Sequence, residues 1–171
     1  MKTLTVKNMV VAAIIAAMYA ALTIAFAPIC YKDLQFRISE ALTVLPIFTI
    51  GAIPGLTLGC VISNIYGVVS GNNPISAIDI LVGSAATLIS AIVTYQLAKI
   101  LKNATQKYIF GPLPTVLINA IVIGAELTIM VGGNIIFNVL LVGIGELAVC
   151  YILGVPLMFA LYKNNLYKKI F

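Results

Sequence analysis

Apolar runs long enough to cross a lipid bilayer recur along this whole sequence, and they restrict its fold more than any other feature. A spanning helix needs about 20 mostly apolar residues, and 62% of the 171 residues are hydrophobic while only 9% are charged. A soluble domain keeps about a quarter of its residues charged. The runs continue far beyond the first one, Val6 to Ala27, so a secreted protein with one cleaved signal is excluded. We therefore predict an all-α integral membrane protein.

Proline and glycine residues divide the apolar runs into six predicted transmembrane helices within a single domain, 1–171. The predicted helices are 6–27, 37–50, 53–69, 79–101, 112–131 and 137–162. An even number of helices places both chain ends on the same side of the membrane. The second helix is the shortest and contains Pro46.

The basic residues predict which side that is. Lysines precede the first helix, lie between the fourth and the fifth, or follow the sixth: Lys2, Lys7, Lys99, Lys102, Lys107, Lys163, Lys168 and Lys169. Positively charged loops face the cytoplasm, so both termini are predicted to be cytoplasmic. Topology and anionic lipid headgroups also account for the net charge of +5, and no nucleic-acid partner is needed to explain it.

The acidic residues have the opposite distribution. All five belong to the outer half of the predicted topology: Asp33, Glu40, Asp79, Glu126 and Glu146. A charge in the hydrocarbon costs at least ~2.5 kcal/mol, so Glu126 and Glu146 are expected to face the bundle interior or a water-filled cavity. Asn119 is two helical turns before Glu126 and shares its face.

Other polar and aromatic side chains fall at a similar depth, and together they predict a substrate cup that opens outward. The candidate binding residues are Gln35, Phe36, Arg37, Glu40, Asn64, Tyr66, Asp79, Asn119, Glu126 and Glu146. A carboxylate can accept two parallel N–H bonds, so this set suits a planar ligand with hydrogen-bond donors along its edges.

Structural interpretations of the same residues stay open. Arg37 and Glu40, three apart, can pair locally at a helix start. Asp79 can cap a helix N-terminus. Asn64 and Asn119 can hold neighbouring helices together.

Two rows of alanines mark the first helix. Each row repeats every four residues, and the members are Ala12, Ala16 and Ala20, and Ala13, Ala17 and Ala21. Small residues at this spacing form a flat strip that another helix can approach closely. The strip serves either packing within the chain or docking of a partner subunit.

No pattern in the sequence predicts bond chemistry. There is no phosphate-binding loop, no nucleophile paired with a base and no metal-ligand cluster, and Cys30, Cys60 and Cys150 have no paired spacing. We expect no enzyme activity and no cofactor on this chain, so the energy for any transport must come from a partner or an ion gradient.

Five motifs, in order along the chain, carry a family resemblance: LQFRISEALTVLP, AIPGLTLGCVISNIYG, IDILVGSAATLISA, INAIVIGAEL and GELAVCYILGVPL. Together they resemble the queuosine-precursor transporter family, whose members are predicted substrate-binding (S) components of energy-coupling factor transporters. The resemblance implies a six-helix S component of an ABC-type importer in a prokaryotic cell membrane. Its implied partners are a transmembrane coupling subunit, docked on the alanine strip, and two cytoplasmic ATPases.

The implied ligand is a 7-deazaguanine base, either a queuosine precursor or queuine. One edge of such a base offers an N–H and an amino group to a carboxylate. Its carbonyl needs a donor, for which Asn64, Asn119 and Arg37 are candidates, and an attached amine would need a second acid.

Two other functions stay open for this chain. One is a stand-alone transporter with an acid as proton carrier, and the other is a membrane scaffold whose polar groups only join helices.

Overall fold

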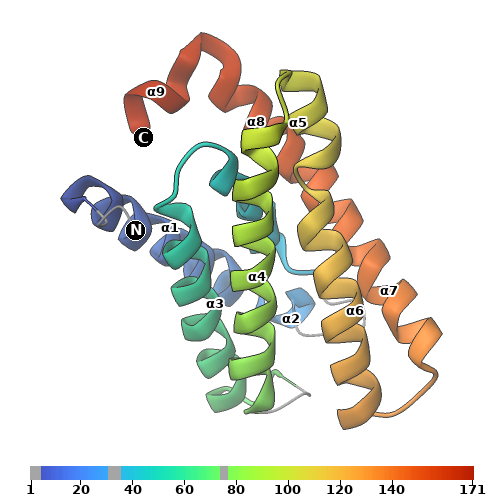
Figure 1. The fold of residues 1–171 in the computed structure, drawn as a ribbon. Coiled ribbons are helices and arrows are strands. Elements are labelled where there is room, and N and C mark those ends of the chain that lie inside the picture. Colours follow the sequence, from blue (N-terminus) through green and yellow to red (C-terminus); the bar gives the residue numbers. More distant parts are fainter. Residues whose placement is uncertain (1–4, 31–35, 74–76) are drawn as a thin grey trace.

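The computed structural model describes residues 5–30, 36–73 and 77–171, and all regular structure in these ranges is helical. The all-α prediction is therefore confirmed. The elements are α1 Val6–Ala25, α2 Ala27–Cys30, η1 Ile38–Ile47, α3 Ala52–Val69, α4 Ile78–Ile100, α5 Ala104–Phe110, α6 Leu113–Met130, α7 Ile135–Val149, η2 Cys150–Gly154, α8 Val155–Tyr162, η3 Lys163–Asn165 and α9 Leu166–Ile170. Helices α3, α4, α6 and α7 stand side by side, while α1 crosses them at a steep angle (Figure 1).

Five helical stretches of the described chain are long and apolar enough to cross a membrane. They are Val6–Ala25, Ala52–Val69, Ile78–Ile100, Ala104–Met130 and Ile135–Tyr162. The predicted helix 37–50 differs from these, because it forms only the ten-residue helix η1. The structure thus has five helices of spanning length and one short apolar helix where the sequence predicts six spanning helices.

η1 is wound as a 3-10 helix, a form that rarely exceeds four residues. It rises about 2 Å per residue rather than 1.5 Å, so its ten residues extend over roughly 20 Å along the helix axis. Every residue from Ser39 to Pro46 is buried. η1 packs against α1, α3, α4, α7, η2 and α8 and is therefore the central element of the bundle.

The last spanning helix is interrupted where it meets η1. Between α7 and α8 the segment η2, Cys150–Gly154, is wound as a π-helix. A Cβ added at Gly154 would lie 3.1 Å from Val44 Cγ1 and 3.2 Å from the carbonyl oxygen of Ala41, both in η1. The wider π turn and the absent side chain together bring the two irregular helices into contact.

Small residues explain the close packing of α1 on α3. A Cβ added at Gly55 would lie 2.7 Å from the carbonyl oxygen of Ala12, and one at Gly59 would lie 2.7 Å from Tyr19 Cβ. Glycines therefore let the two backbones approach closely. The first alanine row, Ala12, Ala16 and Ala20, is buried in this contact, whereas Ala13, Ala17 and Ala21 are exposed. The prediction that the whole strip forms a docking surface is thus corrected, because α3 already covers its first row.

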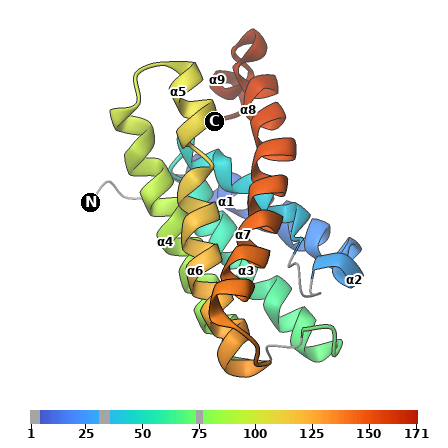
Figure 2. The ribbon, with the colours of Figure 1, turned by 90° about the vertical axis from the view of Figure 1, so that its right-hand side faces the viewer.

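One end of the bundle carries the lysines of the described chain. α5, α8 and α9 lie together at this end, opposite the α3–α4 and α6–α7 connections (Figures 1 and 2). Aromatic rings pack there as well, with Phe48 of the η1–α3 connection 4.9 Å from the ring of Tyr162 and 5.5 Å from that of Tyr167. Lysines and aromatic rings are typical of a membrane interface. The cytoplasmic location of this end remains a prediction.

Candidate functional site

Eight buried polar side chains from seven parts of the fold make up the candidate site, which we call the polar cluster. Its members are Tyr19, Arg37, Glu40, Asn64, Asn73, Asp79, Asn119 and Glu146. None of them is more than 8% exposed. Burying a polar group in an apolar bundle costs free energy unless the group is hydrogen-bonded. The hydrogen bonds of each residue therefore show which helices the cluster joins.

Asp79 lies at the centre of one half of the cluster. Its Oδ2 accepts a bond from Arg37 Nη2 at 2.8 Å and another from Asn73 Nδ2 at 2.7 Å. Its backbone carbonyl accepts a bond from Asn64 Nδ2 at 2.8 Å. One residue of α4 therefore holds the start of η1, helix α3 and the connection between α3 and α4.

Two interpretations from the sequence are corrected here. The ion pair of Arg37 is made with Asp79, 42 residues away, rather than with its near neighbour Glu40. Asp79 does not act as a simple cap, because the N-cap of α4 is Ala77 and no side chain caps that helix.

Glu40 joins η1 to α1. The Tyr19 hydroxyl donates a hydrogen bond to Glu40 Oε1, and one turn further along, Thr23 Oγ1 donates to Ser39 Oγ at 2.7 Å. All four side chains are buried. The second carboxylate oxygen of Glu40, Oε2, is buried with no hydrogen-bond partner among the described residues.

Asn119 and Glu146 join α6 to α7. Asn119 Nδ2 donates to Glu146 Oε1 at 2.9 Å, and the Cys150 thiol lies 3.8 Å from Glu146 Oε2. The interpretation of Asn119 as an interhelical link therefore agrees with this geometry. Its carbonyl oxygen Oδ1 is nevertheless buried and has no partner within the described ranges.

Glu126 is buried beside the cluster and is not bonded to it. Its side chain is 5% exposed, and neither carboxylate oxygen has a hydrogen-bond partner in the part of the chain that the structure describes. It lines a pocket of about 420 Å³ between the first turns of α4 and the last turns of α6. The other lining residues are aliphatic or Met: Ile78, Val82, Ile121, Val122, Ala125, Ile129 and Met130.

Besides Glu126, two described residues of the predicted site do not join the polar cluster. Phe36 is half-buried, and no described polar contact involves it. Tyr66 is 37% exposed on the outer side of α3. Gln35, like Asp33, lies outside the described residues.

Two cluster residues, Tyr19 and Asn73, were not predicted from the sequence. Tyr19 looks like an ordinary apolar-face residue of α1, and only the fold reveals its bond to Glu40. Asn73 lies in a polar turn, SGNNP, which sequence patterns indicate as a loop. The one indication in the sequence was that Asn73 lies only six residues before Asp79, because residues this close in the chain can meet in the fold.

The described residues contain no group of three or more His, Cys, Asp or Glu side chains that could hold a metal ion.

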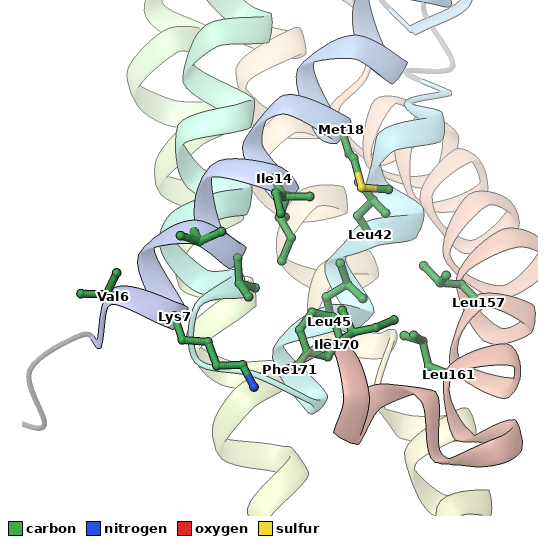
Figure 3. A pocket seen from close by; sticks show the side chains of 13 residues that line it. Val6, Lys7, Ile14, Met18, Leu42, Leu45, Leu157, Leu161, Ile170 and Phe171 are labelled. Carbon is green, nitrogen blue, oxygen red and sulfur yellow. The ribbon is translucent and has the colours of Figure 1, made fainter.

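A second surface feature lies at the lysine end. A groove of about 580 Å³ runs between α1, η1, α8 and α9. Figure 3 shows Ile14 and Met18 of α1 facing Leu42 and Leu45 of η1, with Leu157 and Leu161 of α8 forming the other wall. Its lining is apolar apart from Lys7.

Comparison with known proteins identifies the family. The family model described as QueT transporter matches residues 9–163. The protein named "Queuosine precursor transporter QueT" of Lactococcus lactis subsp. cremoris (strain MG1363) is 34% identical over 84 residues, which are 48% of this chain and 46% of that protein. The matched stretch thus spans about half the length of that relative. No solved structure matches the chain. Because the family match covers most of a chain with five apolar helices of spanning length, the protein belongs to the QueT transporter family and is a multi-pass membrane protein.

Proposed function

We propose that this chain is the substrate-binding component of an energy-coupling factor importer and that it captures a 7-deazaguanine queuosine precursor, or queuine, from the outer side of the membrane. A transmembrane coupling subunit and two cytoplasmic ATPases would supply the movement and the energy. The name of the Lactococcus relative supports the ligand class. The absence of catalytic or ATP-binding motifs from the sequence is consistent with a subunit that only binds.

The observation that carries this proposal is the polar cluster itself. It combines carboxylates and carboxamides inside a largely apolar bundle, and several of its carboxylate and amide oxygens have no hydrogen-bond partner among the described residues. Binding sites for small ligands have this character, with a mainly apolar wall and a few convergent polar groups. A scaffold held together by polar bonds would have its buried atoms paired.

Direct binding tests the proposal. We expect the purified chain in detergent micelles to bind 7-deazaguanine bases in isothermal titration calorimetry and to be stabilised by them against heat. Guanine and unrelated water-soluble vitamins are the comparison ligands. If a vitamin binds and no deazaguanine does, the ligand assignment is wrong.

The exposed side of α1 is the proposed docking surface for the coupling subunit. Ala13 and Ala17 are exposed and directly precede Ile14 and Met18, which are 55% and 47% exposed and line the groove. Small residues beside an apolar groove suit close approach of a partner helix.

Adding bulk to this surface is expected to separate binding from transport. In Ala17→Trp, ligand affinity should stay within about 3-fold of the wild type, while uptake by cells that express the whole transporter should fall at least ~10-fold, because the indole blocks helix approach. Ile144→Trp on α7, where Ile144 is 64% exposed and lines neither the groove nor the Glu126 pocket, is the matched control and should leave uptake unchanged. Normal uptake by Ala17→Trp would place the docking surface elsewhere.

Glu126 supports a second candidate, a stand-alone transporter that carries a proton on this side chain. A buried carboxylate without a partner can change its protonation during a transport cycle. Uptake in cells without the coupling subunit and ATPases distinguishes the two: full uptake that an uncoupler abolishes supports the proton-coupled transporter.

A further inference from the structure

The side-chain amides of the polar cluster have a fixed orientation. A carboxylate only accepts hydrogen bonds when ionised, and a backbone carbonyl always only accepts. The Asn119 group that faces Glu146 Oε1 at 2.9 Å must therefore be its NH₂. The Asn64 group that faces the Asp79 carbonyl at 2.8 Å must be its NH₂ for the same reason. Each amide thus turns its NH₂ toward the protein, and its carbonyl oxygen has no partner among the described residues. Because an NH₂ carries two N–H groups, the donor role of Asn64 or Asn119 toward a ligand carbonyl stays a prediction.

The carbonyl oxygens of these two side chains are acceptors. Glu40 and Asp79 are held in the same half-used way, with one oxygen bonded to protein donors and the other left over. The buried oxygens without a partner among the described residues are Glu40 Oε2, Asn64 Oδ1, Asp79 Oδ1, Asn119 Oδ1 and both carboxylate oxygens of Glu126. Such atoms cost free energy when left unpaired, so the site is suited to a ligand that brings several N–H donors.

The charges of the site are also unequal. Four carboxylates, from Glu40, Asp79, Glu126 and Glu146, are buried in the described helices, and Arg37 is the one buried cation there. Arg37 is bonded to Asp79, Glu40 to a phenol and Glu146 to an amide. Glu126 alone among the four accepts no hydrogen bond from the described chain.

The position of Glu126 connects it with the cluster. It follows Asn119 by two turns on the buried face of α6, a distance of about 10 Å along the helix. Across the pocket lies Ile78, the residue before Asp79. The walls around its carboxylate are apolar, which strengthens any ion pair formed there relative to water.

We propose that this site selects a base that carries a protonated amine, and that the Glu126 carboxylate binds that amine while the neighbouring acceptors take up the N–H groups of the ring. This inference rests on the proposed function, since it distinguishes among deazaguanine ligands. It assigns Glu126 the role of a specificity-determining residue. A ligand with a neutral substituent at the same ring position would leave the Glu126 charge unpaired.

A matched pair of ligands tests the inference. The probes are 7-aminomethyl-7-deazaguanine, which is cationic at neutral pH, and 7-cyano-7-deazaguanine, which has the same ring and a neutral substituent. With the purified full-length chain, we expect the amine to bind at least ~10-fold more tightly than the nitrile. In Glu126→Gln, affinity for the amine should fall about 30-fold or more, because a buried charge loses its partner. Affinity for the nitrile should stay within about 3-fold.

The charge-conserving variant is the control. Glu126→Asp retains the carboxylate and should keep a clear preference for the amine, which a merely structural role of Glu126 does not predict. Equal losses for both ligands in Glu126→Gln, or equal affinities of the wild type for the two, would overturn the inference and leave the proposed function standing. Absence of binding by both ligands would overturn the proposed function as well.

Discussion

Replacement of Asp79 by leucine is expected to lower the free energy of unfolding by about 3–5 kcal/mol, because the change leaves the buried Arg37 guanidinium without its counter-ion. Arg37 is 5% exposed and Asp79 is fully buried, and their 2.8 Å contact joins η1 to α4. The loss of the Asn73 bond to the same carboxylate oxygen adds to the effect. Unfolding in mixed micelles, followed by circular dichroism, measures it.

The double variant Arg37→Met with Asp79→Leu separates the cost of an unpaired charge from the value of the pair. Two well-packed apolar side chains can replace a buried ion pair at little cost, so the double variant should recover most of the lost stability. An additive loss in this thermodynamic cycle would show that the two charges are not coupled, contrary to the geometry.

The second large effect is expected on ligand binding. In Glu40→Gln, affinity for a 7-deazaguanine base should fall about 30-fold or more, because a neutral amide replaces a buried carboxylate. The Gln carbonyl can still accept the bond from the Tyr19 hydroxyl that now reaches Oε1, so the fold should be retained. The group left over would then be an NH₂, which meets ligand donors unfavourably. Isothermal titration calorimetry measures the change.

Tyr19→Phe is the control for Glu40. It removes the phenol that holds Glu40 Oε1 and leaves the charge in place, so we expect a smaller loss of about 3- to 10-fold, the value of one hydrogen bond. A Glu40→Gln variant with wild-type affinity would remove Glu40 from the binding site.

The sequence was sufficient to predict the helical membrane fold and the burial of several polar residues. Burial of a charge is so costly in a bilayer that Glu126 and Glu146 had to lie inside the bundle or at a cavity, and both are buried. The seven-residue spacing of Asn119 and Glu126 correctly predicted a shared face of one helix. These predictions succeeded because they rest on local periodicity and on the cost of desolvation.

Hydrogen bonds and ion pairs between residues far apart in the chain could not be predicted from the sequence. Local spacing favoured Arg37 with Glu40, but tertiary contacts bring Asp79 and Tyr19 to these two residues instead. The winding of the second helix was also missed. Every residue from Ser39 to Pro46 is buried, so η1 has no exposed polar face. Without such a face, the spacing of apolar residues cannot distinguish a ten-residue 3-10 helix from an α-helix.

The 3-10 winding of η1 has a consequence for how freely this segment can vary in length. Three residues make one turn of a 3-10 helix, so side chains three positions apart lie in a row along one side of the helix. One such row begins at the N-cap Arg37 and continues with Glu40, Thr43 and Pro46. In an α-helix each step of three would drift by roughly 60°. Substitutions can change the chemistry of this row one position at a time. A single inserted or deleted residue, by contrast, would turn every later side chain by about 120°. The number of residues in η1 is therefore expected to tolerate less change than their identity.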